Sequence, residues 1–298
     1  MPIIPNSPAQ MHKARQVAES FGNDPARYDR SRPSYPAALV RRILAESPGR
    51  EILDAGTGTG ITARLFQAAG CTVLGVEVDG RMADFARKAG TEVEVATIEA
   101  WDPAGRTFDA VVAGQAWHWV DPVAGAAKAA AVLRPGGRFA AFWNVQQPAP
   151  EAAAAFAEAH RRHVPEMPSS RPGFSALGAY SVMCDNAARG LRATDGAFGE
   201  SEIWQFEWDQ TYTRDEWLDV VPTQGGYSLL PEEQSNALLG ALGDAIDELG
   251  GSFAMHYTTV AVTATRFPSS PVRGEPHVPS ATTVQGATDK ERNSTPEG

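Results

Sequence analysis

The chain is poor in cysteine and contains no long apolar run. Only Cys71 and Cys184 occur among its 298 residues, which excludes a disulfide framework and a paired-cysteine zinc or redox motif. No apolar stretch approaches the roughly 18 residues that a membrane span requires, and the first residues lack the positive and apolar segments of a signal peptide. We therefore expect a soluble, cytoplasmic protein without a membrane partner.

Positive charge is also scarce. The sequence has 26 Lys and Arg against 36 Asp and Glu, a formal net charge of -10. A protein that binds the phosphates of nucleic acids needs a basic surface. The composition therefore predicts no nucleic-acid partner, and it leaves the oligomeric state undefined.

Composition and pattern divide the chain into five parts. The last residues are punctuated by Pro, Ser and Thr and offer few large apolar side chains, so burial cannot offset the entropy of ordering them. The predicted parts are a flexible leader (1–20), an N-terminal segment (21–50), an α/β core (51–145), a cap with the last two strands (146–266) and a disordered tail (267–298).

Short apolar runs alternate with helical patterns in the predicted core. Strands are expected at 51–54, 72–77, 92–95, 108–113 and 138–143, with helices at 62–69, 81–89 and 121–133. The strands are apolar on both faces, as parallel strands covered by helices on both sides are. This alternation predicts a doubly wound α/β sheet.

The pattern changes beyond the core. Helices are expected at 151–163, 214–221 and 231–249, whereas 164–200 shows no clear period. Trp204, Phe206 and Trp208 alternate with polar residues, which is typical of a strand covered on one face. A final strand is expected at 256–266.

A glycine-rich turn connects the first predicted strand to the first helix. Asp54 precedes Gly56, Gly58 and Gly60, and glycines let the backbone turn sharply and approach a ligand closely. A P-loop would need Lys followed by Ser or Thr after its last glycine, and a dinucleotide fingerprint would space the glycines differently. A site for nucleoside triphosphate hydrolysis is therefore excluded, and a dinucleotide site is disfavoured.

This spacing resembles the S-adenosylmethionine site of class I methyltransferases of the type 11 kind. The second predicted strand ends at Glu77, where a carboxylate can accept hydrogen bonds from ribose hydroxyls. The strand at 108–113 and the Arg134-Pro-Gly-Gly137 turn also match that family. The resemblance implies a Rossmann-like seven-stranded sheet with its last strand antiparallel, a mainly helical cap, and S-adenosylmethionine as cofactor.

A second, narrower resemblance lies in the N-terminal segment. Tyr28, Arg32 and Tyr35 stand in a Tyr-Asp-x-x-Arg-Pro-x-Tyr-Pro stretch similar to that of small-molecule methyltransferases related to trans-aconitate methyltransferase. In that subgroup the segment lies over the cofactor. The resemblance implies that Arg32 or Tyr28 binds the cofactor carboxylate, for which an arginine is well suited.

The resemblance also assigns the other cofactor contacts. The glycines would pass under the methionine part, Asp54 would brace the loop or the amino group, and Glu77 would hold the ribose. Thr97 stands where an Asp is commoner in the family, at the edge of the adenine. The full expected cofactor set is Asp54, Gly56, Thr57, Gly58, Gly60, Glu77, Val78, Thr97, Ile98, Glu99, Gln115 and Arg32.

The loops after the fourth and fifth predicted strands lie at the ligand end of such a sheet. We expect His118 to act as a general base or as a substrate-orienting donor, because an imidazole titrates near neutral pH. The alternative is a structural role in sealing the pocket. Tyr28 is a second catalytic candidate, and the expected substrate contacts are Tyr35, Trp117, Trp119, Trp143 and Asn144.

These observations predict a methyltransferase acting on oxygen, nitrogen or carbon of a small metabolite, aromatic or apolar, in secondary metabolism. His160 and His163 lack a third ligand, so no metal is expected. The alternatives are an NAD(P)-dependent oxidoreductase and a non-catalytic adenosyl-binding module.

Overall fold

The computed structural model describes residues 12–13, 15–167, 170 and 176–268. Most of the expected leader, and the expected tail from residue 269 onward, lie outside these residues. All structural statements below concern the described part of the chain.

A seven-stranded sheet forms the centre of the fold, with the strand order β3-β2-β1-β4-β5-β7-β6. Neighbouring strands run parallel from β3 to β5, whereas β7 runs antiparallel to both β5 and β6. Only β7 therefore opposes the others, as expected from the sequence. The strands are β1 (Glu51–Ala55), β2 (Thr72–Glu77), β3 (Glu92–Val95), β4 (Phe108–Gly114), β5 (Leu133–Pro148), β6 (Glu202–Thr213) and β7 (Ser252–Thr265).

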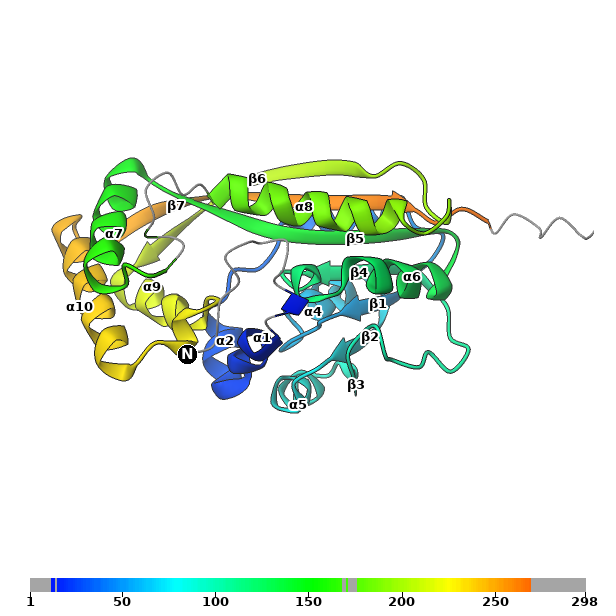
Figure 1. Cartoon of the computed structure of the whole chain (residues 1–298), viewed down its shortest axis with the longest axis horizontal. Coiled ribbons are helices and arrows are strands. Elements are labelled where there is room, and N and C mark those ends of the chain that lie inside the picture. Colours follow the sequence, from blue (N-terminus) through cyan, green and yellow to red (C-terminus); the bar gives the residue numbers. More distant parts are fainter. Residues whose placement is uncertain (1–11, 14, 168–169, 171–175, 269–298) are drawn as a thin grey trace, which may run out of the picture. The chain divides into compact units, whose positions relative to one another are not determined.

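Helices pack on both faces of this sheet (Figure 1). On one face, α3 and α4 bury Ile43 and Phe66 against β1, β4 and β5. On the other face, α6 and α8 bury Ala129 and Leu191 against the same strands. The strands carry apolar residues on both sides because both sides are covered. The helices of the core are α3 (Ala37–Ala45), α4 (Ile61–Ala68), α5 (Gly80–Lys88), α6 (Pro122–Val132) and α8 (Ala176–Arg192).

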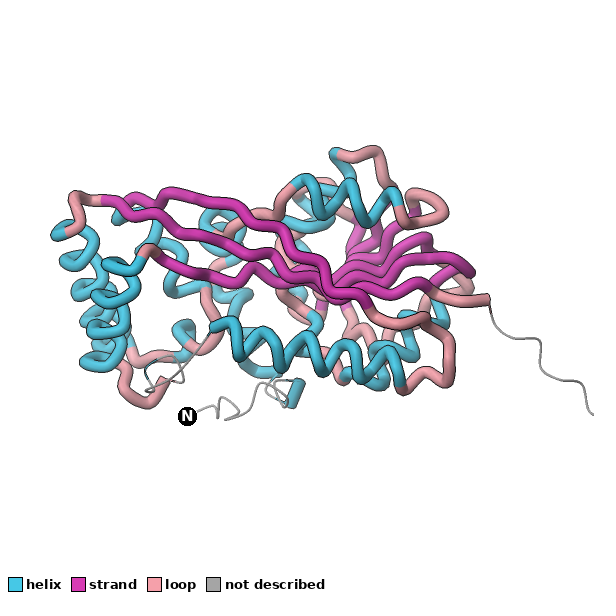
Figure 2. The backbone as a smooth tube through the Cα atoms, turned by 90° about the horizontal axis from the view of Figure 1, so that it is seen from above, coloured by secondary structure: helices cyan, strands magenta, loops and turns pink. Residues whose placement is uncertain are grey.

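Three strands, β5, β7 and β6, extend well beyond the parallel strands (Figure 2). Their pairing runs without a break from Arg138 opposite Thr265 to Pro148 opposite Met255, and β6 pairs with β7 along its whole length. The extension carries the cap. The cap consists of α7 (Pro150–His163), α9 (Arg214–Val220) and α10 (Glu232–Glu248), with the 3-10 turns η5 (Val221–Thr223) and η6 (Tyr227–Leu229).

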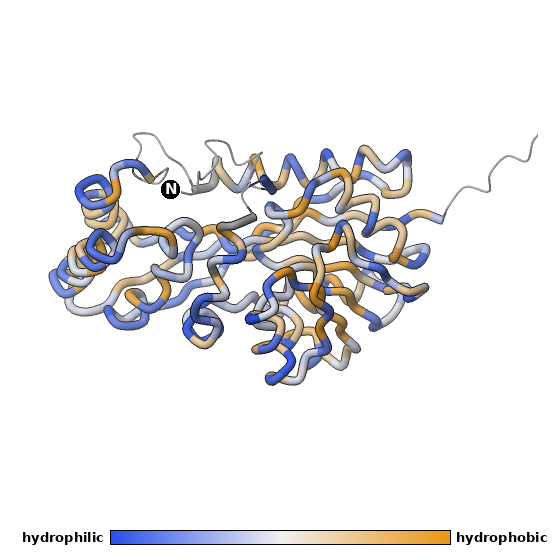
Figure 3. Tube along the Cα trace, turned by 60° about the horizontal axis from the view of Figure 1, so that its bottom comes forward, coloured by the Kyte–Doolittle hydropathy of each residue, from blue (hydrophilic) through white to orange (hydrophobic). Residues whose placement is uncertain are grey.

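The cap has an apolar core of its own. Phe156, Tyr212, Trp217 and Phe253 pack ring to ring, with Trp217 stacked on Phe156 at a centroid distance of 5.9 Å. Figure 3 shows apolar segments along the strands and polar residues on the outer sides of the helices. A second cluster of buried side chains therefore holds the cap to the strand extension.

The N-terminal segment comprises α1 (Arg15–Ser20), the turn η2 (Phe21–Asn23) and α2 (Pro25–Ser31) before α3. Ion pairs fix α2 on two sides. Asp219 of α9 pairs with Arg27 at 2.8 Å and with Arg30 at 2.6 Å, and Asp29 pairs with Arg64 of α4 at 2.6 Å. The segment is thereby placed between the cap and the carboxyl ends of the parallel strands.

Two elements differ from the sequence prediction. Helix α8 lies in the stretch 164–200, where no clear period is visible in the sequence. Its buried face consists mostly of small residues, Cys184, Ala187 and Ala188, with Leu191 as a large apolar residue, so the apolar period is weak. Strand β5 begins at Leu133 and includes the Arg134–Gly137 turn, where the register against β4 shifts. The left-handed φ of +81° at Gly136 accommodates this irregularity.

Candidate functional site

The glycine turn between β1 and α4 forms the floor of the site. Gly56, Gly58 and Gly60 have φ values of +72°, +57° and +89°, in the left-handed region that favours glycine. A Cβ on Gly56 would lie 2.5 Å from the Cβ of Ala116, in the loop after β4. The turn therefore needs glycine at this position both for its backbone angle and for its close approach to the neighbouring loop.

Glu77, at the end of β2, is held by two backbone N–H groups. Its Oε2 accepts from the N–H of Gly58 at 2.8 Å, and its Oε1 accepts from the N–H of Asp79 at 3.0 Å. Burial raises the pKa of Glu77, and these hydrogen bonds act in the opposite direction. Glu77 is only 8% exposed, and its carboxylate lies at the pocket with unused lone pairs.

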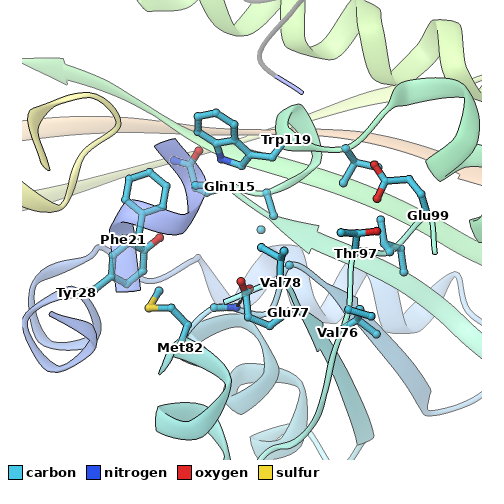
Figure 4. Close-up of a pocket in the computed structure, with 18 residues that line it drawn as sticks. Phe21, Tyr28, Val76, Glu77, Val78, Met82, Thr97, Glu99, Gln115 and Trp119 are labelled. Carbon is cyan, nitrogen blue, oxygen red and sulfur yellow. Dashed lines mark hydrogen bonds between the residues drawn. The ribbon is translucent and has the colours of Figure 1, made fainter. Parts of the chain in front are cut away.

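A pocket opens above the carboxyl ends of β1, β2 and β4 (Figure 4). Glu77 and Val78 lie on one side of it, with Phe21, Tyr28 and Trp119 across from them. The rings of Phe21 and Tyr28 are 5.8 Å apart, and those of Phe21 and Trp119 are 6.2 Å apart. Ten of the residues expected at the site line this pocket: Tyr28, Gly56, Gly58, Glu77, Val78, Thr97, Ile98, Glu99, Gln115 and Trp119.

A second pocket adjoins the first. Tyr28, Gly56, Gly58, Gly114 and Gln115 line both pockets, so the two share the glycine turn and the end of β4. The second pocket adds further expected residues, namely Arg32, Tyr35 and Thr57. The structure thus brings the N-terminal segment and the glycine turn together around one continuous site.

Arg32 is a half-buried guanidinium with no hydrogen bond or ion pair among the described residues. Its charge lies 5.3 Å from the centre of the Tyr28 ring and acts electrostatically on Tyr35, Tyr180 and Tyr257. Burial raises the pKa of each of these three phenols, so they stay neutral at physiological pH. A cation among hydroxyl donors is suited to an anionic ligand group.

Asp54 is fully buried beneath the glycine turn. Its Oδ2 accepts from Thr57 Oγ1 at 2.6 Å, while its Oδ1 is buried without a hydrogen-bond partner among the described residues. Burial raises the pKa of Asp54 to about 7, and the nearby charge of Glu77 adds to this effect. Asp54 therefore changes charge near neutral pH.

His118 lies in the turn η3 (Trp117–Trp119) and lines neither pocket. Its Nδ1 accepts a hydrogen bond from Trp143 Nε1 at 3.0 Å. Burial lowers the pKa of His118 to about 3, and the charge of Arg32 contributes to the same shift. The imidazole is neutral at physiological pH.

The structure does not bring three of the expected substrate contacts to either pocket. Trp117 is buried against Phe139 at a centroid distance of 4.7 Å, and Trp143 is fully buried in the same cluster. Asn144 donates to Ser34 O at 2.9 Å and accepts from Thr259 Oγ1 at 2.7 Å. These side chains support the loops around the site from within the core.

Three more expected residues lie elsewhere than predicted. Asp54 and Gly60 line neither pocket, and Gly60 is the N-cap of α4. Trp119 lies in the same pocket as Glu77 and Thr97, not in a separate substrate pocket.

The sequence did not predict several residues that line the first pocket. Phe21, Met82, Ala116 and Val120 all line the first pocket. Phe21 stands in the stretch that resembles the small-molecule subgroup, so its aromatic ring was a usable signal. Met82 faces the pocket from the first turn of α5, and nothing in its local sequence distinguishes it from a core residue.

No group of three or more potential metal ligands occurs among the described residues. Both ring nitrogens of His160 form hydrogen bonds, one with Phe156 O and one with Tyr227 Oη.

No helix in the described part of the chain is both long and apolar enough to cross a bilayer.

Comparison with known proteins relates the core to methyltransferases. Residues 53–141 match the family model described as a methyltransferase domain. An uncharacterized methyltransferase of Mycobacterium bovis is 39% identical over 135 residues, which is 44% of this chain and 55% of that protein. The ubiquinone biosynthesis O-methyltransferase of Methylocella silvestris is 34% identical over 146 residues, 46% of this chain and 56% of that protein. The matches span about half the length of these relatives.

A solved structure shares the fold. A putative type II methyltransferase from Anaeromyxobacter dehalogenans superposes with a TM-score of 0.55 and 23% identity, covering 80% of this chain and 99% of that chain. This likeness and the strand order confirm the expected Rossmann-like fold with seven strands. The matches do not specify a subgroup, so the relation to trans-aconitate methyltransferase stays a prediction.

The close approach of Gly56 to Ala116 generates a first prediction. Gly136 has a similar φ of +81° but has nothing within 4 Å of an added Cβ, so Gly136→Ala reports backbone strain alone. We expect Gly56→Ala to lower the free energy of unfolding by about 1–3 kcal/mol more than Gly136→Ala does, as measured by urea denaturation. Adding Ala116→Gly to Gly56→Ala should recover part of this loss, and strictly additive effects would contradict the contact.

The buried carboxyl of Asp54 generates a second prediction. Its pKa is about 7 in the folded chain and about 4 when unfolded, so the folded state binds the extra proton and loses stability as pH rises through this range. Asp54→Asn removes this loss. We expect the stability of the variant relative to wild type, measured by urea denaturation without ligand, to increase by about 2–3 kcal/mol between pH 5 and pH 8. A difference that does not change with pH would exclude this titration.

Proposed function

We propose that this chain is an S-adenosylmethionine-dependent methyltransferase acting on a small molecule. The observation that carries the proposal is the Glu77 carboxylate, fixed by two backbone N–H groups at one end of a glycine turn, in a pocket with aromatic walls. The methyltransferase domain match at 53–141 supports the same reaction class.

The first pocket fits an adenosine. Glu77 would accept hydrogen bonds from both ribose hydroxyls, because each of its oxygens has a lone pair beyond its backbone bond. Val78 and Ile98 offer apolar surface for a purine, and Thr97 and Glu99 offer polar atoms at its edge. The Glu99 carboxylate accepts from the N–H of Asp121 at 3.0 Å, which fixes its position.

The second pocket fits the amino acid end of the cofactor. Arg32 lines this pocket and has no anion among the described residues, so it would bind the carboxylate of the cofactor. Asp54 lies beneath the glycine turn, where its buried Oδ1 has no partner, so its charge would attract the ammonium group through the turn. An ammonium group near Asp54 would lower the pKa of this carboxyl again. Arg32 in the pocket wall and the buried carboxyl of Asp54 beneath the glycine turn therefore fit the two charges of the amino acid end of S-adenosylmethionine.

The bound cofactor would supply an electrophilic methyl group on a sulfonium. This chain would orient that group and exclude water, since Phe21, Tyr28 and Trp119 close the side of the pocket opposite Glu77. Tyr28 lines both pockets, which supports the proposal that it is a catalytic residue. Positive charge disperses during transfer, which aromatic walls tolerate.

The finer parts of the proposal come from the N-terminal segment and from composition. The placement of Tyr28, Arg32 and Tyr35 across the site supports a small-molecule enzyme of the trans-aconitate methyltransferase kind. The acidic net charge of -10 supports a substrate other than nucleic acid. Cytoplasmic location and a role in secondary metabolism belong to the same proposal.

Titration calorimetry on the full chain with S-adenosylmethionine, S-adenosylhomocysteine and NAD tests the cofactor. We expect micromolar binding of the first two and none of NAD; binding of NAD alone would favour an oxidoreductase.

Glu77→Ala should weaken S-adenosylhomocysteine binding by about 1–3 kcal/mol, or roughly 5- to 150-fold, through lost ribose hydrogen bonds. Glu92→Ala, an exposed acid on the neighbouring strand β3, is the matched control and should bind like wild type.

A truncated ligand isolates the role of Arg32. Methylthioadenosine has the adenosine but lacks the amino and carboxylate groups, so it cannot engage Arg32. We expect Arg32→Met to weaken S-adenosylhomocysteine binding by about 1.5–3 kcal/mol and to leave methylthioadenosine binding unchanged in the same calorimetric assay. Equal losses for both ligands would show that Arg32 acts on the fold of the pocket. Arg41→Met, on the exposed side of α3, controls for the loss of one charge.

A further inference from the structure

The two pockets meet at a junction that the cofactor of the proposed function has to cross. In S-adenosylmethionine the sulfur joins the adenosine to the amino acid end. With the adenosine in the first pocket and the amino acid end in the second, the sulfur and its methyl group lie where the pockets meet. The residues that line both pockets therefore surround the sulfonium, and they are Tyr28, Gly56, Gly58, Gly114 and Gln115.

Two of these five residues, Tyr28 and Gln115, carry a side chain, and the other three are glycines. An added Cβ at Gly114 would lie 2.4 Å from Thr62 Oγ1, so a side chain has no room at that position. Figure 4 shows Gln115 across the pocket from Glu77. Among the described residues that line both pockets, Gln115 supplies the one carboxamide.

The backbone of Gln115 has a conformation that residues other than glycine rarely adopt. Its φ is +53°, in the left-handed region that is unfavourable for any residue with a Cβ. Its N–H donates to Phe142 O at 2.8 Å, which holds the conformation. A glycine would fit this position without strain, and strained conformations of this kind are concentrated at functional sites. The strain indicates that the Gln115 side chain has a role that a glycine could not fill.

A hydrogen bond orients the carboxamide of Gln115. Its Nε2 donates to Asn144 O, on strand β5, at 3.4 Å. Strand β4 lies between β1 and β5, so the amide nitrogen is turned towards β5 and the oxygen, on the other arm of the planar group, towards the side of β1 and the pockets. Tyr180 also hydrogen-bonds this carboxamide. Because an amide oxygen has two lone pairs, it can still accept from a ligand.

An acceptor at the junction distinguishes the two forms of the cofactor. The sulfonium of S-adenosylmethionine is positive and polarises its methyl hydrogens, whereas the thioether of S-adenosylhomocysteine is neutral and has no methyl group. Arg32 lines the second pocket, and its charge opposes a positive group nearby. An amide oxygen attracts the methyl group through its dipole and through C–H···O contacts, and so offsets this repulsion.

We propose that Gln115 recognises the sulfonium methyl group through its amide oxygen, and that the site thereby discriminates the methylated cofactor from its demethylated product. The inference rests on the proposed function and adds to it the residue that responds to the presence of the methyl group. Once the methyl group has been transferred, this contact is lost. Gln115 therefore favours the exchange of the product for a new cofactor molecule.

Titration calorimetry of the full chain with S-adenosylmethionine and S-adenosylhomocysteine tests the contact. Gln115→Met keeps the length of the side chain and removes the amide oxygen. We expect this variant to weaken binding of S-adenosylmethionine about 2- to 10-fold more than binding of S-adenosylhomocysteine. Equal weakening of both ligands, or a larger loss for S-adenosylhomocysteine, would overturn the inference.

Thr97→Val is the matched control, because Thr97 lines the first pocket at the adenine edge, which both ligands share. This variant should change the two affinities by the same factor. If it changes their ratio as much as Gln115→Met does, the ratio does not report a contact with the methyl group and the inference fails. Failure of both ligands to bind wild type would instead refute the proposed function.

Urea denaturation without ligand tests whether the strained backbone is kept for the side chain. Gln115→Gly and Gln115→Ala both remove the carboxamide, but only the glycine relieves the strain. We expect Gln115→Gly to be the more stable of the two, the reverse of the usual order, and both to lose the preference for S-adenosylmethionine as Gln115→Met does. Ala104→Gly, at a φ of +49° in an exposed turn, should also be more stable than wild type. A glycine variant that is less stable than the alanine variant, or one that keeps the wild-type ratio of affinities, would contradict the proposal.

Discussion

The hydrogen bonds between the glycine turn and the end of β2 fix the geometry on which the site depends. The N–H groups of Gly56 and Thr57 both donate to Val76 O, at 2.8 and 3.2 Å, and the next glycine donates to Glu77. The turn and the acidic strand end are therefore one rigid unit. Because these bonds involve backbone groups, the arrangement depends on strand register and on left-handed glycine angles more than on side-chain packing. Both pockets are built on this unit.

The remaining walls come from segments that are far apart in sequence. The N-terminal segment lies over the unit because its ion pairs to α4 and α9 connect it to the core and to the cap at once. The cap in turn depends on the long antiparallel strands, which carry a separate aromatic core beyond the parallel sheet. Cap, strand extension and N-terminal segment thus stabilise one another around the carboxyl ends of the parallel strands.

Burial decides the chemistry of the polar groups at the site. Burial raises the pKa of Asp54 to about 7. Burial and the charge of Arg32 lower the pKa of His118, which keeps its ring uncharged. Arg32 itself has no anionic partner among the described residues. In a medium of low dielectric such groups interact strongly with a charged ligand. In the proposed function, this is how Arg32 would attract the carboxylate of the zwitterionic cofactor.

The sequence by itself determined the features that depend on neighbouring residues. The alternation of strands and helices, the glycine turn and the acid at the end of β2 are local patterns, so the fold class and the positions of Gly56, Gly58 and Glu77 could be predicted directly from the sequence.

The tertiary structure alone decided which tryptophans face the site. Trp117 and Trp119 lie in the turn after β4, and Trp143 lies within β5. Only Trp119 lines the pocket, because Phe139 and helix α6 bury Trp117 while the core around β5 buries Trp143. The same holds for α8, whose buried face of mostly small residues gives a weak pattern, and for His118, whose Nδ1 accepts from Trp143, 25 residues away in the chain. Contacts of this kind depend on how distant segments pack, and no local pattern encodes them.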